Sequence, residues 1–293
     1  MNLKSKVQES SWGILIFLSI LWGCSFILIK KALISFDPIQ LGCLRLGISS
    51  LAFAPVVWWH RKDIEWGRLP LFMAVGLTGS GIPAFLFAYA QTEVSSSLAG
   101  LLNSLTPIWT LIIGLFLFRL KFSNIKLAGV ITGFIGAGML ILLGNGGVAD
   151  GIQWHGLLIV VATVCYGSSV NMVQAFFGDT KPAIISSMSF FVIGIPALIW
   201  LFTTDFLHVM AHDSQAWWSL GSVTILSLFG TVMASMIFYY LVQKTSAVFG
   251  STVTYLMPVV ALAWGILDGE TITTLHIAGL ALILAGVYFT KRS

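Results

Sequence analysis

Two apolar stretches of the sequence each contain one proline, Pro107 and Pro258, directly preceded by polar residues. Inside a helix, proline lacks a backbone donor and leaves the carbonyl four residues earlier without its partner. Within a membrane such a carbonyl needs a polar neighbour or water. We therefore predict helix breaks at the two prolines, with nearby polar side chains that contact a substrate. These side chains are Asn103, Thr252 and Tyr255. The alternative for each is a hydrogen bond to its own backbone, in a kink that is purely structural.

Trp22 and Tyr166 lie near the middle of long apolar stretches, 144 positions apart. Interfacial aromatic belts lie at the ends of membrane spans, so a mid-span position needs another explanation. An aromatic ring at this depth can stack on a substrate or hold a cation over its face. Trp109 receives the same interpretation. We predict that all three contact the substrate, with helix packing as the alternative for each residue considered alone.

Arg45 is the one unambiguous charge inside an apolar stretch, seven residues after Pro38 and roughly 10 Å deep at the helical rise. A buried arginine is costly unless it pairs, meets water or reaches the surface. We interpret Arg45 as a gate or as a contact for a substrate carboxylate, with a structural arginine as the alternative. Lys30 is predicted to gate the outer mouth with Glu93 or Asp37, unless its ammonium group only extends to the interface.

No aspartate or glutamate lies deep within an apolar stretch. Proton-coupled carriers often use such a carboxylate as a relay. Its absence favours facilitated diffusion or exchange, and a cavity with little fixed charge favours neutral or zwitterionic solutes.

The segment 205–213 holds two aspartates and two histidines, the histidines four residues apart. It stands in a connection between apolar stretches, so we interpret it as a solvated loop and expect no metal. The sequence contains no nucleotide-binding loop, no hydrolase nucleophile elbow and no zinc-protease helix. We therefore expect no enzyme activity, no cofactor and no nucleic-acid partner.

The composition identifies the setting of these residues. Of the 293 residues, 57% are apolar and 9% are charged, whereas soluble domains carry about 25% charged residues. Apolar runs of roughly 18 or more residues are typical of transmembrane helices. We predict an all-α integral membrane protein with ten transmembrane helices. The predicted spans are 11–30, 38–59, 69–90, 94–118, 124–144, 153–175, 182–204, 215–241, 246–267 and 273–290.

The second half of the sequence repeats the plan of the first. Pro258 follows Pro107 by 151 positions, and the segments 95–114 and 246–265 keep the same offset. Five spans in each half is an odd number, so the second half must cross the membrane in the opposite sense. We predict two five-helix inverted-topology repeats. The predicted domains are a first repeat at 1–144, a linker at 145–152 and a second repeat at 153–293.

The basic residues predict the orientation. If the amino terminus is cytoplasmic, twelve lysine and arginine residues lie on the cytoplasmic side, against Lys30 and Lys31 on the other side. Cytoplasmic loops of membrane proteins carry such an excess of lysine and arginine. Both termini are therefore predicted to be cytoplasmic.

Short motifs are spread over the whole chain. They are residues 21–26 (LWGCSF) with Lys30, residues 44–46 (LRL), residues 105–107 (LTP), residues 255–258 (YLMP) and residues 269–270 (GE). In this order they resemble the drug/metabolite transporter superfamily, in its ten-helix EamA-type branch. The resemblance covers residues 12–290. One departure is residues 118–119 (FR), where the family usually has an acidic residue.

This resemblance implies that helices one to four and six to nine surround a cavity, with helices five and ten outside it. It also implies a bacterial inner-membrane transporter that exports amino acids, related metabolites or toxic compounds. We expect a facilitator or exchanger that works by alternating access. The alternatives are a proton-coupled efflux pump and a receptor or scaffold without transport activity. The expected partners are a small-molecule substrate and the lipid bilayer, and the expected state is a monomer or weak homodimer.

Overall fold

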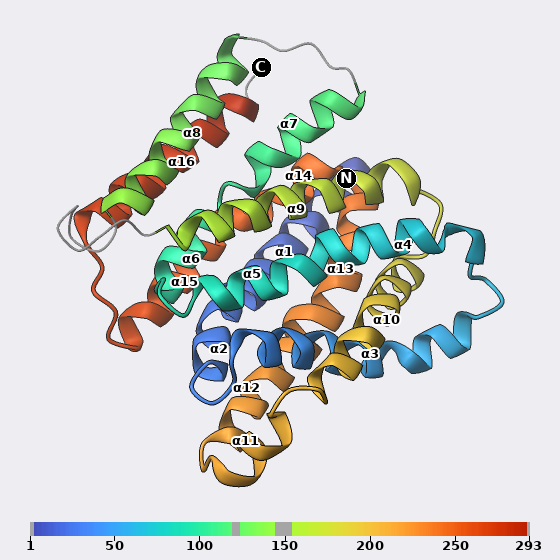
Figure 1. Ribbon diagram of the computed structural model, residues 1–293. Helices are drawn as coiled ribbons and strands as arrows, with labels where there is room; N and C mark the ends of the chain where they lie inside the picture. The colour runs from blue at the N-terminus through green and yellow to red at the C-terminus, as the bar shows by residue number, and fades with distance from the viewer. Residues whose placement is uncertain (1–2, 119–123, 144–153, 292–293) are drawn as a thin grey trace.

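The computed structural model describes residues 3–118, 124–143 and 154–291 (Figure 1). Every element in these ranges is helical. Eight helical stretches have the length and hydropathy of membrane spans, and two shorter apolar helices, Ala128–Leu142 and Thr274–Phe289, bring the number among the described residues to ten. The predicted ten-helix membrane fold is therefore confirmed. The predicted linker at 145–152 lies outside the described ranges.

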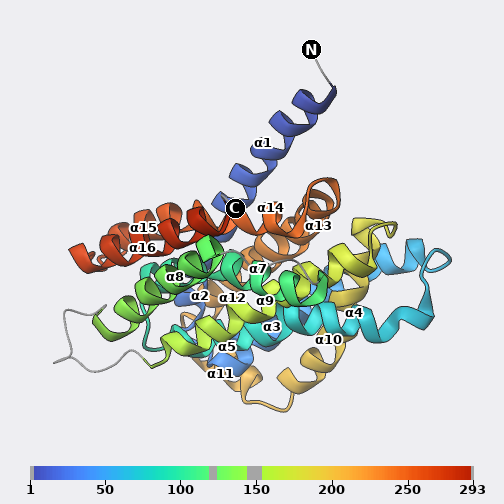
Figure 2. The same cartoon turned by 90° about the horizontal axis from the view of Figure 1, so that it is seen from above.

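In the first half, three of the five spans are interrupted. The elements are α1 (Leu3–Gly23), α2 (Ser25–Ala32), α3 (Pro38–His60), η1 (Trp66–Arg68), α4 (Leu69–Gly76), η2 (Leu77–Gly81), α5 (Ile82–Ala90), α6 (Ser96–Asn103), α7 (Thr106–Phe118) and α8 (Asn124–Leu143). The first span breaks at Cys24, the third contains the π-helix η2, and the fourth breaks at Ser104 and Leu105. The first span was predicted as one continuous helix. In the structure α1 also begins earlier, and its amino-terminal end projects beyond the bundle (Figure 2).

The second half repeats the interruptions in its third and fourth spans. The elements are α9 (Gly156–Phe176), α10 (Pro182–Leu201), α11 (Phe206–His212), α12 (Ala216–Ser227), η4 (Leu228–Met233), α13 (Ala234–Lys244), α14 (Ala247–Ser251), η5 (Thr252–Tyr255), α15 (Met257–Leu267) and α16 (Thr274–Lys291). The π-helix η4 begins 151 positions after η2, as the repeat requires. The first span of this half, α9, is continuous, unlike its counterpart α1–α2.

Serine caps fix the starts of two equivalent helices. Ser95 Oγ accepts a hydrogen bond from the Leu98 amide at 3.2 Å, at the start of α6. Ser246 Oγ accepts one from the Phe249 amide at 3.1 Å, at the start of α14. Such caps satisfy amides that have no partner within the helix. The two halves of the chain therefore also agree in the positions at which these two helices begin.

Helices α8 and α16, the fifth and tenth spans, pack against each other at the edge of the bundle (Figure 1). A Cβ atom on Gly136 would lie 2.8 Å from the carbonyl oxygen of Gly279, and one on Gly286 would lie 2.5 Å from that of Gly129. Small residues allow this close backbone approach between membrane helices. The contact therefore depends on glycine at both positions.

We expect the substitution Gly286→Leu to separate α8 from α16 and to lower the melting temperature of the purified protein. Overpacking a tight contact costs about 1–3 kcal/mol, and here the obstructing atoms are backbone. The measurement is thermal unfolding in detergent, followed by tryptophan fluorescence. Gly138→Ala in α8 is the control, because nothing lies within 4 Å of a Cβ atom there. Equal melting of both variants and the wild type would contradict this packing.

Candidate functional site

A central cavity of about 110 Å³ lies between the two repeats. Equivalent positions of both repeats line it: Gly79 and Ser80 come from η2, and Gly230 and Thr231 come from η4. A water molecule needs roughly 10–15 Å³ of such space. The cavity therefore has room for several waters or one compact solute. Among the described residues, α8 and α16 contribute nothing to the lining.

The π-helix η4 directs one backbone carbonyl group and one side-chain hydroxyl group toward the first repeat. A π-helix has an extra residue in one turn, which moves its polar groups out of α-helical register. The carbonyl oxygen of Gly230 accepts a hydrogen bond from Trp22 Nε1 at 2.7 Å. Thr231 Oγ1 accepts one from Arg45 Nε at 3.1 Å, and donates to the carbonyl oxygen of Leu226 at 3.2 Å. The interruption thus orients both Trp22 and Arg45.

The irregular segments of spans four and nine meet beside the cavity. Ser104 Oγ donates to the carbonyl oxygen of Thr254 at 3.1 Å. Ser19 Oγ of the first span donates to the carbonyl oxygen of Val253 at 2.8 Å. Carbonyl groups that a regular helix would satisfy internally thus find partners on other helices. Asn103, the last residue of α6, lines the cavity.

The two prolines begin helices in the structure. Pro107 is the second residue of α7 and Pro258 the second residue of α15. The missing N–H group of proline is harmless there, because the first turn of a helix has no internal partner for it. The chain is irregular just before each proline, at Ser104 and Leu105 and at η5.

Four of the predicted site residues come together around the cavity. Trp22, Arg45, Asn103 and Tyr166 all line it. They belong to α1, α3, α6 and α9, so three come from the first repeat and one from the second. A contact of any of them with substrate stays a prediction.

The other three predicted substrate contacts lie outside the lining. Trp109 packs edge-on against Phe134 of α8, with ring centroids 5.1 Å apart. Thr252 Oγ1 donates to the carbonyl oxygen of Phe249 at 2.6 Å, which is the backbone bond given above as its alternative. Thr252 and Tyr255 share one side of η5, because residues three apart eclipse each other in a 3₁₀-helix. The intervening residues, Val253 and Thr254, line the cavity instead.

Sequence reasoning missed the polar residues of the two π-helices. Ser80 and Thr231 line the cavity, and each directly follows a glycine, Gly79 or Gly230. The two glycine–hydroxyl pairs are 151 positions apart. This shared offset, within otherwise apolar spans, was the available signal.

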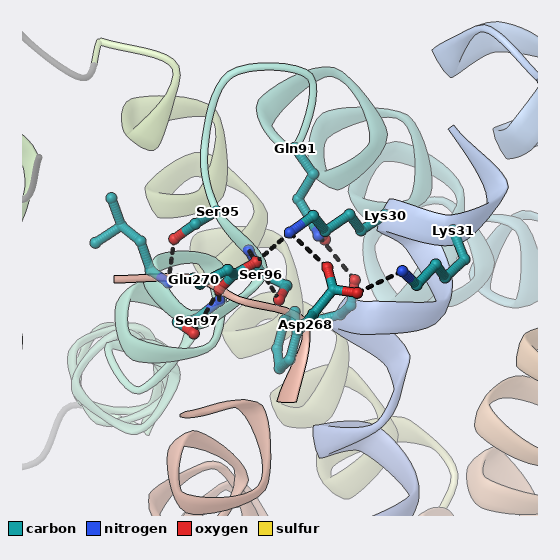
Figure 3. Close-up of polar contacts among 10 residues, drawn as sticks. Lys30, Lys31, Gln91, Ser95, Ser96, Ser97, Asp268 and Glu270 are labelled. Atoms are coloured by element: carbon teal, nitrogen blue, oxygen red, sulfur yellow. Dashed lines mark hydrogen bonds and ion pairs between the residues drawn. The ribbon is translucent and has the colours of Figure 1, made fainter. Parts of the chain in front are cut away.

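A second polar site, the Lys30 cluster, consists of Lys30, Lys31, Asp268, Glu270 and the first residues of α6 (Figure 3). Lys30 Nζ lies 2.7 Å from Asp268 Oδ2 and 2.8 Å from Glu270 Oε1. Lys31 pairs with Asp268. The cluster therefore joins the end of the first span to the loop that follows the ninth.

Glu270 also binds the start of α6. Its Oε1 accepts hydrogen bonds from the amide and hydroxyl groups of Ser96 at 3.0 and 2.8 Å, and its Oε2 accepts those of Ser97 at 3.0 and 2.6 Å. Burial alone would raise the pKa of the Glu270 carboxyl, but the hydrogen bonds from Lys30, Ser97 and Ser96 outweigh it and lower the pKa to about 2. Glu270 is thus a fixed negative charge at a helix amino terminus, where the helix dipole also favours it.

The partners predicted for Lys30 were wrong. Asp37 caps α3, where its carboxylate accepts hydrogen bonds from the Ile39 and Gln40 amides. Glu93 is exposed, and within the described part of the chain it forms no ion pair. The actual partners come from a segment about 240 positions away, which only the packing of the two repeats brings close.

The geometry of two similar halves around one cavity agrees with comparisons to known proteins. Residues 10–142 and 153–292 each match the EamA-like transporter family. The chain belongs to this family. A relative in Salmonella typhimurium, named as a probable amino-acid metabolite efflux pump, is 28% identical over 92% of this chain and 90% of its own length. An uncharacterized transporter of Archaeoglobus fulgidus is 27% identical over 96% of this chain and 98% of its own.

A third relative and one solved structure are also similar to this EamA-family protein. The uncharacterized inner membrane transporter YedA of Escherichia coli is 25% identical over 94% of this chain and 89% of its own length. One crystal structure superposes with a TM-score of 0.63 at 16% identity, over 96% of each chain, which shows a shared fold. The protein is therefore a multi-pass membrane transporter.

The two ends of this EamA-family bundle differ in charge. The position equivalent to Lys30 is Gln174, whose Oε1 accepts a hydrogen bond from the Ala247 amide at 2.5 Å, at the start of α14. Ala247 is the equivalent of Ser96. One helix start is thus capped by a carboxylate in an ionic cluster, and its counterpart at the opposite end by a neutral amide. Arg119, the equivalent of Glu270, lies outside the described residues.

We expect the Lys30 cluster to hold its end of the bundle closed independently of pH over the physiological range. In the structure the pKa of Glu270 falls from its ordinary value of 4.5 to about 2. Its ionised form therefore stabilises closure at every pH above 4.5, and this contribution is lost as the pH falls through about 2. Spin labels on Ile34→Cys and Leu267→Cys, both exposed, should report an unchanged distance between about pH 5.5 and pH 8.

Glu270→Gln removes the charge and should lengthen that distance. Asp63→Asn is the matched control, because Asp63 pairs with Lys181 at the exposed surface, where an ion pair contributes little. A Glu270→Gln protein with the wild-type distance distribution would show that the cluster does not hold this end closed.

Proposed function

We propose that this EamA-family transporter moves small organic metabolites across the membrane by alternating access. The preferred substrates are amino acids and related neutral or zwitterionic solutes, which it exports as a facilitator or exchanger. The observation that carries the proposal is the cavity between the repeats, lined by interrupted helices from both. Interrupted helices at the interface of inverted repeats are where such carriers bind their substrates.

The Lys30 cluster is the proposed gate at one end of the bundle. It ties α2, α6 and the loop after α15 together, and α6 and α15 are also closely packed: a Cβ atom on Gly100 would lie 2.5 Å from that of Ala261. In the alternating-access cycle this contact separates when the cavity opens at this end. The gating roles proposed for Lys30 and Glu270 follow from this arrangement.

Two observations support compact, amino-acid-like substrates. The cavity of about 110 Å³ is small for bulky toxic compounds, since pockets for drug-sized ligands measure about 300–1,000 Å³. The Salmonella typhimurium relative is named as a probable amino-acid metabolite efflux pump. By analogy with the relatives named as bacterial transporters, we place the protein in a bacterial inner membrane. The count of basic residues supports cytoplasmic termini.

The charges support facilitated transport or exchange over proton coupling. No carboxylate belongs to the described residues that line the cavity. Glu270 has a pKa of about 2 while the gate is closed, and its ordinary value of 4.5 would leave it ionised at neutral pH when the gate opens. A proton relay needs a group that changes its protonation in the cycle.

Counterflow in proteoliposomes tests this function. Vesicles loaded with an unlabelled amino acid should accumulate the labelled one without a pH gradient. Asn103→Ala removes a polar group from the lining and should raise KM roughly three- to tenfold. Thr252→Ala, which alters a hydroxyl outside the lining, is the control and should keep the wild-type KM.

Two results would count against the proposal. Uptake no greater than in protein-free vesicles, across a panel of amino acids and related metabolites, would contradict transport of these solutes. Accumulation that requires an imposed pH gradient would instead support the proton-coupled alternative.

A further inference from the structure

Arg45 is a buried positive charge without a counter-ion. Its exposed fraction is 7%, and it lines the cavity. A guanidinium group stays protonated in proteins and offers five N–H donors. Among the described residues, the one side-chain hydrogen bond of Arg45 is that of Nε to Thr231 Oγ1, and none of the ion pairs includes it.

The fold itself does not require a cation at this position. The equivalent of Arg45 in the second repeat is Ser189, a buried neutral residue on α10. The same helix packing is therefore achieved there without charge. An unpaired charge in a membrane-embedded site is costly and commonly marks a functional site. Arg45 is thus better explained by a ligand than by packing.

The chemistry around Arg45 specifies the ligand. Its planar guanidinium matches a carboxylate, which can accept two parallel hydrogen bonds. Arg45 is the one basic residue in the described lining. The cavity therefore suits a ligand with a single negative charge better than a phosphate dianion. Among the other lining residues, Ser25 and Asn103 offer hydroxyl and amide groups, and Trp22 and Tyr166 offer aromatic rings. Such groups can receive an ammonium group or an apolar side chain.

We propose that Arg45 is the anion subsite of the cavity, and that the ligands are small monocarboxylates, zwitterions included, whose carboxylate binds its guanidinium. The inference rests on the proposed transport function and narrows its substrate class. Thr231 is the positioning residue, because its hydroxyl holds Nε and leaves the terminal nitrogens to the ligand. Organic cations without a carboxylate are excluded by repulsion.

Matched ligand pairs test the subsite in the wild-type protein. Phenylalanine is compared with phenylalaninamide, threonine with threoninamide, and 3-phenylpropionate with its amide, by thermal shift and by tryptophan fluorescence. Each carboxylate should bind at least about tenfold more tightly than its amide, as expected for loss of one charge-assisted contact. Amides that bind as well as the acids, or a panel without any binding, would overturn the subsite.

Three variants test whether the acid-over-amide preference comes from Arg45. Arg45→Gln should reduce the acid-over-amide preference to within about twofold, and Arg45→Lys should retain part of it, because lysine keeps the charge but lacks the planar fork. Arg61→Gln, an exposed arginine at the end of the same span, is the control and should keep the full preference. A full preference in Arg45→Gln would overturn the assignment.

If Arg45→Gln does not fold, Thr231→Val keeps the charge and removes only its orienting hydrogen bond. It should raise the KM for carboxylates severalfold, and by a larger factor than the KM for the matched amides. An unchanged KM for carboxylates would overturn the positioning role.

Flux separates this inference from the proposed function. Proteoliposomes that transport the amides or amines as well as the acids, independently of Arg45, would overturn the subsite and leave transport intact. Acid-selective binding that Arg45→Gln abolishes, without flux of any ligand in the panel, would support the subsite and overturn transport.

Discussion

The carboxylate of Glu270 joins segments that are far apart in the sequence. Its two oxygens accept five hydrogen bonds, from Lys30 and from the amide and hydroxyl groups of Ser96 and Ser97. These bonds lower its pKa from 4.5 to about 2, so this arrangement favours the ionised carboxylate over the protonated group. Residues of α2, α6 and α15 all line the cavity, so this side chain links the ends of three elements that enclose it.

Irregular backbone in a membrane protein must be covered by protein or by water. Two inverted repeats offer a solution, because each supplies a π-helix and a broken helix to the same interface. The bond from Ser104 to the Thr254 carbonyl and that from Trp22 to the Gly230 carbonyl each cross between the repeats. The centre of the bundle is therefore the place where interrupted helices are tolerated, and polar groups gather there as a result.

Much of the fold could be predicted from composition and periodicity, since long uncharged runs and a constant offset leave few other arrangements. Residues on regular helices, such as Trp22 and Tyr166, were also placed at the cavity. The position of Thr252 outside the cavity lining could not be foreseen, because a 3₁₀ turn rotates side chains differently from an α-helix. The partner of Lys30 could not be found, because a contact across 240 positions depends on how the two repeats pack.

The basic residues at the span ends differ in their surroundings from Arg45, which lines the cavity. The ion pairs among the described residues lie at span ends and in loops, where Lys30, Lys31, Arg68 and Lys181 pair with carboxylates. Arg61 and Lys244, also at span ends, lie over aromatic rings. Arg45 differs from them because it is buried without an ion pair to any described residue, and the equivalent residue of the other repeat, Ser189, is neutral. A departure from local pairing persists when something outside the chain compensates it. In a chain built by duplication, a charged residue that breaks the symmetry at the shared cavity is therefore the position on which the proposed anion subsite rests.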